Sequence, residues 1–115
     1  MNTSKHDANL LAAMLIGANE SEYVRFTGTW LSRVTDWRTA PQQTNNEVVD
    51  AFVAAASSYA ALANGEPEPK WANGNRLKSF WYGGHPGLFA WSFAHTPGPF
   101  KSRGLIVEDA SLISV

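Results

Sequence analysis

The feature that most constrains this fold is an aromatic segment near the C-terminus, residues 78–107. It holds seven of the chain's fourteen aromatic residues, three of its six prolines and five of its nine glycines. Proline and glycine interrupt a long helix, so the segment is predicted to be irregular. A disordered linker is excluded, because so much aromatic surface must be buried in the protein or against a partner.

Two helices are predicted before residue 40. The first is expected over residues 4–19, with Ser4 as its N-cap, because apolar residues recur there at helical spacing. The second is expected over residues 21–38. Gly28 lies in its middle and either divides it into two helices or lets one bent helix pack closely against a neighbour.

A third helix is the clearest prediction from the sequence. Thr44 and Glu47 have the spacing of a capping box, and Gly65 is a typical residue at a helix end. Alanines at 54–56 favour the close approach of another helix. We therefore expect a mainly α, single-domain helical bundle over residues 1–115, with three longer helices closed by an irregular aromatic-rich C-terminal third.

The C-terminal third is predicted to contain only short elements. We expect a surface loop over 66–75, held to the bundle by Trp71, and then a series of short pieces. These are a helix or strand over 76–82, a helix from Pro86 to Thr96, a short helix capped by Thr96 and ending at Gly104, an extended stretch over 105–107, and a final turn from Asp109 to Leu112.

The chain has no predicted membrane span. Its apolar run over residues 10–18 is well short of the roughly 20 residues that cross a bilayer, and acidic residues flank it, so we expect a core helix. The chain has no cysteine, which excludes a disulfide framework, a thiolate nucleophile and a Cys-based zinc site. We expect a cytoplasmic protein.

No pattern of chemistry-bearing residues predicts catalysis. The histidines at 6, 85 and 95 lack metal-ligand spacing, the carboxylates are scattered, and no serine lies in a GxSxG sequence. We expect His95 to cap carbonyl groups or pack at a helix end. We predict no cofactor, no metal and no catalytic residues, with a His/carboxylate hydrolase only as the third hypothesis for function.

The charges are divided unevenly along the chain. All five charged residues between 70 and 103 are basic, whereas residues 1–69 hold eight acidic and four basic side chains. One interpretation is a surface for nucleic acid or an acidic protein partner, with aromatic side chains available for stacking. The other, which we favour, is that the aromatic residues are core and the charges solvate its rim, because they are too sparse for a dense basic patch.

The order of residues over 71–112 resembles that of small uncharacterised bacterial proteins of antitoxin-like or accessory type, encoded beside predicted nucleotidyltransferase toxins. The resemblance consists of spaced apolar residues and one continuous stretch: Trp71, Leu77, Trp81, Leu88, Ala90, then TPGPFKSRGLIV and Leu112. It implies a protein that neutralises or regulates another protein, and it implies no catalytic residue.

These observations favour a non-enzymatic protein-interaction module, antitoxin-like or an inhibitor of a bacterial toxin or defence protein. The alternative is a small nucleic-acid-binding regulator that uses the basic aromatic C-terminal end. We expect four aromatic residues to close the core: Trp81, Phe89, Phe93 and Phe100. The residues left as candidates for partner contact are Tyr82, His85, Trp91, Lys101 and Arg103.

Overall fold

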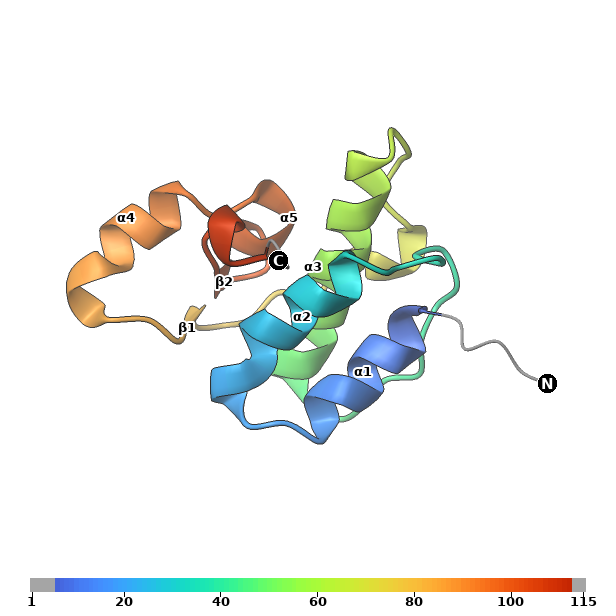
Figure 1. Ribbon diagram of the computed structural model, residues 1–115, viewed down its shortest axis with the longest axis horizontal. Helices are drawn as coiled ribbons and strands as arrows, with labels where there is room; N and C mark the ends of the chain where they lie inside the picture. Colours follow the sequence, from blue (N-terminus) through green and yellow to red (C-terminus); the bar gives the residue numbers. More distant parts are fainter. Residues whose placement is uncertain (1–5, 113–115) are drawn as a thin grey trace.

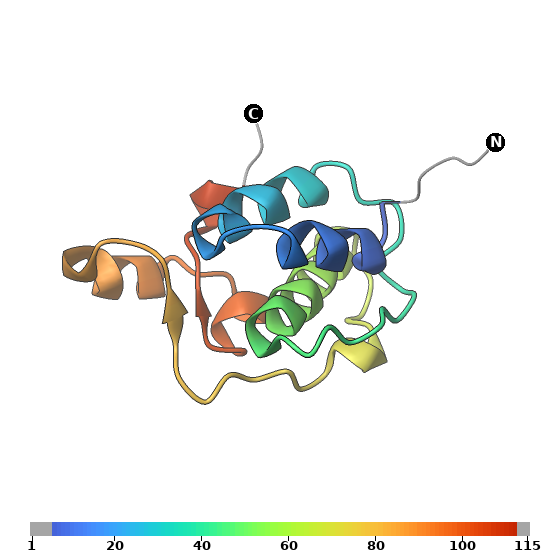
Figure 2. The same ribbon diagram turned by 90° about the horizontal axis from the view of Figure 1, so that it is seen from below.

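Residues 6–112 are described by a computed structural model, and more than half of them lie in helices (Figures 1 and 2). The α-helices are α1 (Ala8–Ile16), α2 (Tyr23–Leu31), α3 (Glu47–Ala63), α4 (Phe89–Ala94) and α5 (Gly98–Lys101). Two short strands, β1 (Trp81–Tyr82) and β2 (Leu105–Ile106), form a small sheet. Four 3-10 helices complete the described part: η1 (Glu20–Glu22), η2 (Lys70–Ala72), η3 (Pro86–Leu88) and η4 (Asp109–Leu112). Within residues 6–112, no helix is long and apolar enough to cross a membrane.

The first two helices are shorter than predicted. The N-cap of α1 is Asp7, whose carboxylate accepts a hydrogen bond from the Leu10 amide, whereas Ser4 lies outside the described residues. Helix α2 ends at Leu31 and does not continue to residue 38. The following segment leaves the helix because the Thr35 amide donates to the His6 carbonyl at 3.0 Å, which draws it alongside the start of α1.

Gly28 permits close packing and does not divide α2. It is buried, and a Cβ atom at this position would lie only 3.0 Å from the Leu112 carbonyl oxygen in η4. The backbones of α2 and η4 are therefore very close at Gly28. This agrees with the second of the two interpretations of Gly28, in which it lets the helix pack closely against a neighbour.

Helix α3 lies at the centre of the described structure, with α1, α2, α5 and η2 packed against it. Its residues 51–58 are all buried, and the alanines among them allow this close approach. The predicted capping box is wrong in detail. Asn46 is the N-cap and accepts hydrogen bonds from the amides of Val48 and Val49, while the Thr44 hydroxyl donates to Asp50 at 2.9 Å.

The aromatic core centres on Phe52 in α3. Its ring packs edge-on against Tyr23, Trp81 and Phe100, with centroid distances of 4.9–6.3 Å. Trp81 and Phe100 thus contact the core as expected. Phe89 and Phe93 do not, because α4 projects away from α3 and places both rings against Phe80 instead.

Other C-terminal predictions are confirmed in part. Trp71 packs against the core and donates from its indole to the Arg38 carbonyl at 2.9 Å, which holds its loop in place. The stretch after Gly104 is extended and forms β2, and η4 is the expected final turn. Thr96 is not an N-cap, since Pro97 takes that position in α5.

Strands β1 and β2 pair in parallel, with Trp81 opposite Leu105 and Tyr82 opposite Ile106. Two further backbone bonds extend the contact: Leu77 donates to the Arg103 carbonyl, and Trp81 donates to the Gly104 carbonyl. Between the strands the chain leaves the body and returns, so that α4 lies at the edge of the molecule in both views (Figures 1 and 2).

Arg103 is buried, contrary to our expectation that it would be available to a partner. Only 4% of its surface is exposed, and its guanidinium donates to the carbonyls of Pro99 and Ala72, both at 2.7 Å, and to the Ser58 hydroxyl at 3.2 Å. Burial lowers the pKa of the Arg103 guanidinium, while the Glu68 carboxylate, 3.8 Å away, opposes that shift. Arg103 therefore links α5, α3 and η2 inside the protein.

Replacing this residue tests its internal role. We expect Arg103→Met to lower the free energy of unfolding by about 2–4 kcal/mol, because buried carbonyl groups would lose their donors. Lys78→Met, at an exposed position, should change it by less than about 0.5 kcal/mol. Urea denaturation followed by tryptophan fluorescence measures both, and equal midpoints for Arg103→Met and the parent would contradict the prediction.

The contact of α2 with η4 gives a second prediction. We expect Gly28→Val to lower the free energy of unfolding by about 1–3 kcal/mol, since the new side chain would press on the Leu112 backbone. Gly17→Ala is the control, because a Cβ there meets only the Ala13 carbonyl oxygen at an ordinary 3.8 Å. Thermal unfolding followed by circular dichroism compares the stability of the two variants. If Gly28→Val is as stable as Gly17→Ala, η4 can move away from α2 at no cost and the prediction is wrong.

Candidate binding site: the aromatic arm and the pocket at its base

We call residues 80–95 the aromatic arm; it comprises Phe80, β1, η3 and α4, and its part after β1 projects from the rest of the protein (Figure 1). Its inner packing is aromatic. The Phe80 ring lies 6.0 Å from Phe89 and 5.8 Å from Phe93 between centroids, and Tyr82 meets Phe89 edge-on at 5.3 Å. Such edge-on pairs are favourable beyond the area they bury, so these contacts give the arm a small core of its own.

A second face of the arm is apolar and open to solvent. Leu88 and Trp91 are 53% and 51% exposed, and Phe80 is 60% exposed. Leu88, Trp91 and His95 follow at steps of three and four, which places them on one side of η3 and α4. The His95 ring stacks on Trp91 at 4.1 Å, and its Nδ1 lies 2.8 Å from the Trp91 carbonyl oxygen, which confirms the predicted packing and capping role of His95.

The base of the arm is fixed to the body through hydroxyl groups. Ser92 is fully buried and its hydroxyl donates to Glu108 at 2.8 Å. The Thr96 hydroxyl donates to the Ser92 carbonyl at 2.7 Å and accepts a hydrogen bond from the Val107 amide at 3.1 Å. Thr96 thus joins α4 to the chain after β2, which is why it is not free to cap α5.

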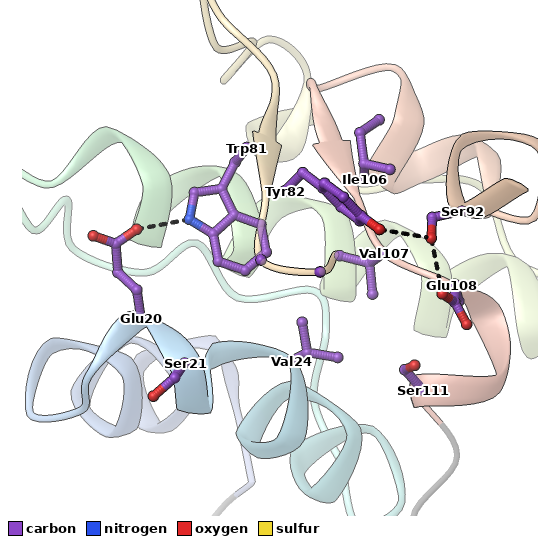
Figure 3. Close-up of a pocket in the computed structure, with 12 residues that line it drawn as sticks. Glu20, Ser21, Val24, Trp81, Tyr82, Ser92, Ile106, Val107, Glu108 and Ser111 are labelled. Carbon is purple, nitrogen blue, oxygen red and sulfur yellow. Dashed lines mark hydrogen bonds between the residues drawn. The ribbon is translucent and has the colours of Figure 1, made fainter. Parts of the chain in front are cut away.

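A pocket of about 260 Å³ lies where the arm meets the body (Figure 3). Trp81 and Tyr82 form one wall, and Val24 of α2 lies opposite. The Trp81 indole donates to the Glu20 carboxylate at 2.7 Å. The residues that line it are Glu20, Ser21, Val24, Trp81, Tyr82, Gly83, Gly84, Ser92, Ile106, Val107, Glu108 and Ser111.

Tyr82 is held firmly in this wall. Its hydroxyl donates to the His85 carbonyl at 2.8 Å and lies 3.2 Å from the Ser92 hydroxyl oxygen. Gly84 passes directly over the ring, since a Cβ there would lie 2.5 Å from the Tyr82 hydroxyl oxygen. A side chain at Gly84 would therefore displace Tyr82 or move the backbone.

The structure separates the five residues predicted to contact a partner. Trp91 lies on the open apolar face, and His85 is exposed at the start of η3, where its Nδ1 accepts a hydrogen bond from the Gly87 amide. Tyr82 is partly buried and lines the pocket. Lys101 is partly buried with its ammonium 4.8 Å from the Phe93 ring centroid, and Arg103 lies inside the body.

Several residues of this site were missed by sequence reasoning. Phe80 and Leu88 were not among the contact candidates, although the spacing of Leu88 with Trp91 and His95 could have indicated a shared helix face. Glu20 and Glu108 could not have been paired with the arm, because they come from segments 88 positions apart that only the fold brings to one pocket.

The pocket does not have the arrangement of a known nucleophilic site. Ser92 hydrogen-bonds directly to Glu108 and is fully buried, and none of the described residues that line the pocket is a histidine that could accept its proton. Within residues 6–112, no three His, Asp or Glu side chains lie together in a group that could hold a metal ion.

Comparisons of this chain with protein-family models, with curated proteins and with solved structures gave no match.

Proposed function

We propose that this protein is a non-enzymatic protein-interaction module, of antitoxin or inhibitor type, and that its partner contacts the aromatic arm. The observation that supports this most directly is the exposed apolar face of the arm. Large apolar side chains gathered on one projecting element are a common mark of a protein-binding surface. Burying the Trp91 and Leu88 side chains against a partner would contribute roughly 1.5–3 kcal/mol each.

The internal packing of the arm also supports binding. The Phe80, Phe89 and Phe93 rings contact one another, and Ser92 ties α4 to the body through Glu108. Because these contacts hold the arm before a partner arrives, less conformational entropy is lost on association. This suits an inhibitor that binds stoichiometrically and tightly.

The charge around the arm indicates which kind of partner fits. From residue 76 to 103 every charged residue is basic, and Lys78, two positions before Phe80, is exposed. A partner with an apolar patch rimmed by acidic side chains would complement this surface and associate faster at low salt. Arg103 adds nothing to this rim, because it is buried.

Nucleic-acid binding is the second candidate. The exposed Trp91 ring could stack on a base, and four basic side chains other than Arg103 lie between residues 70 and 101. The burial of Arg103 weakens this candidate, since it removes one of the five charges on which the sequence argument depended.

The protein-binding proposal predicts a contact at the arm. We expect a photoreactive amino acid placed at position 88 to cross-link one partner in the native host, whereas the same group at position 16 should not. Ile16 is the matched control, because it is 51% exposed on α1.

With that partner purified, Trp91→Ala should weaken the affinity by about tenfold or more without lowering the melting temperature, as an exposed tryptophan is a typical binding hot spot. Ile16→Ala should leave the affinity unchanged. Equal cross-linking at positions 16 and 88, or equal affinities for the two alanine variants, would refute the proposal.

The nucleic-acid hypothesis is tested by measuring how the affinity for oligonucleotides depends on salt concentration. We expect single-stranded oligonucleotides to bind no more tightly than about 100 µM at physiological salt, since so few basic side chains release few counterions. Fluorescence anisotropy measures the affinity at several salt concentrations. Tight binding that falls steeply with salt and is lost in Lys78→Ala would favour a nucleic-acid-binding regulator instead.

A further inference from the structure

Among the described residues that line the pocket at the base of the arm, two carry carboxylates and none is basic. Glu20 comes from η1 and Glu108 from the chain after β2, and they are the only charged residues among the twelve that line the pocket. Figure 3 shows them at opposite ends, with Trp81 and Tyr82 between them. The pocket therefore has a negatively charged group at each end.

Among the described residues, the hydrogen-bond partners of both carboxylates are neutral groups. Each accepts one hydrogen bond from a neutral group, Glu20 from the Trp81 indole and Glu108 from the Ser92 hydroxyl. Those bonds fix the orientation of the carboxylates but leave their charges in place, and a carboxylate can accept about four hydrogen bonds. Among the ion pairs between described residues, none involves Glu20 or Glu108.

The middle of the pocket is apolar and aromatic. Val24 and Val107 face the Trp81 and Tyr82 side chains across it (Figure 3). Methylene groups pack well against such walls, and aromatic faces attract a cation. Its volume of about 260 Å³ lies just below the roughly 300–1,000 Å³ of sites for drug-sized ligands, which suits a short unbranched molecule.

We propose that this pocket binds a cationic amine or guanidine carried on a short alkyl chain, with the charge at a carboxylate and the methylene groups between the aromatic rings and the valines. The chemistry is shared by free linear diamines and by lysine or arginine side chains of another protein. The binding site does not depend on a partner contacting the apolar face of the arm, so it can be tested on the purified protein alone.

Isothermal titration at low salt with 1,4-diaminobutane and with N-acetyl-arginine amide tests the proposal. We expect at least one of them to bind. For the diamine, Glu20→Gln and Glu108→Gln should each weaken binding about tenfold or more, and for the arginine amide at least one of the two variants should do so, because a charge-assisted hydrogen bond is lost. Glutamine keeps the acceptor for Trp81 or Ser92, so these variants should fold normally. Tighter binding of the diamine identifies a free amine as the ligand, and tighter binding of the arginine amide identifies a protein side chain.

Two further variants separate the pocket from general attraction to an acidic protein. Glu47→Gln removes a carboxylate at the start of α3, outside the pocket, and should leave binding unchanged. Gly84→Val keeps both charges but would displace Tyr82, so it should weaken binding about as much as the glutamine variants. The proposal is overturned if neither ligand binds, or if Glu47→Gln weakens binding as much as Glu108→Gln does.

Discussion

The parallel pairing of β1 with β2 is the constraint from which the shape of the C-terminal third follows. Parallel strands cannot be joined by a tight turn and need a crossover of a dozen or more residues. Here the crossover is made of η3, α4 and α5, and its first part projects as the aromatic arm. Immediately before β2, the buried guanidinium of Arg103 donates to the carbonyls of Pro99 and Ala72 and so fixes the chain where the second strand begins.

The arm and the body divide the aromatic residues between two packed groups. In the body, the Phe52 ring contacts Tyr23, Trp81 and Phe100. In the arm, the Phe80 ring contacts the two phenylalanines of α4. A separate packed group explains how a short projection can hold a defined form while leaving Leu88 and Trp91 exposed. The pocket lies at the boundary of the two groups, where Trp81 belongs to one and Tyr82 to the other.

Local sequence signals predicted the elements that depend on local interactions. Helix α3 is predictable because its apolar residues recur at helical spacing over seventeen residues, and close packing at Gly28 is one of the two interpretations that the sequence offers. The predictions failed where a distant segment competes for the backbone. Helix α2 ends early because the His6 carbonyl accepts a hydrogen bond from the Thr35 amide. The Thr96 hydroxyl accepts from the Val107 amide and does not cap the helix that follows it. His6 and Val107 both lie far outside the turn of helix with which Thr35 and Thr96 would otherwise bond, so local sequence patterns do not reveal these hydrogen bonds.

The sequence by itself determined that the chain is mainly helical, that its C-terminal third is irregular, and that aromatic residues there must be buried or bound. Only the tertiary structure decided which of them are buried, because burial depends on the direction in which α4 leaves the body. It placed Arg103 inside and Trp91 outside, although both lie in the same aromatic and basic segment. It also brought Glu20 and Glu108 to one pocket, since residues 88 positions apart line the same cavity only when the strands and helices between them have packed.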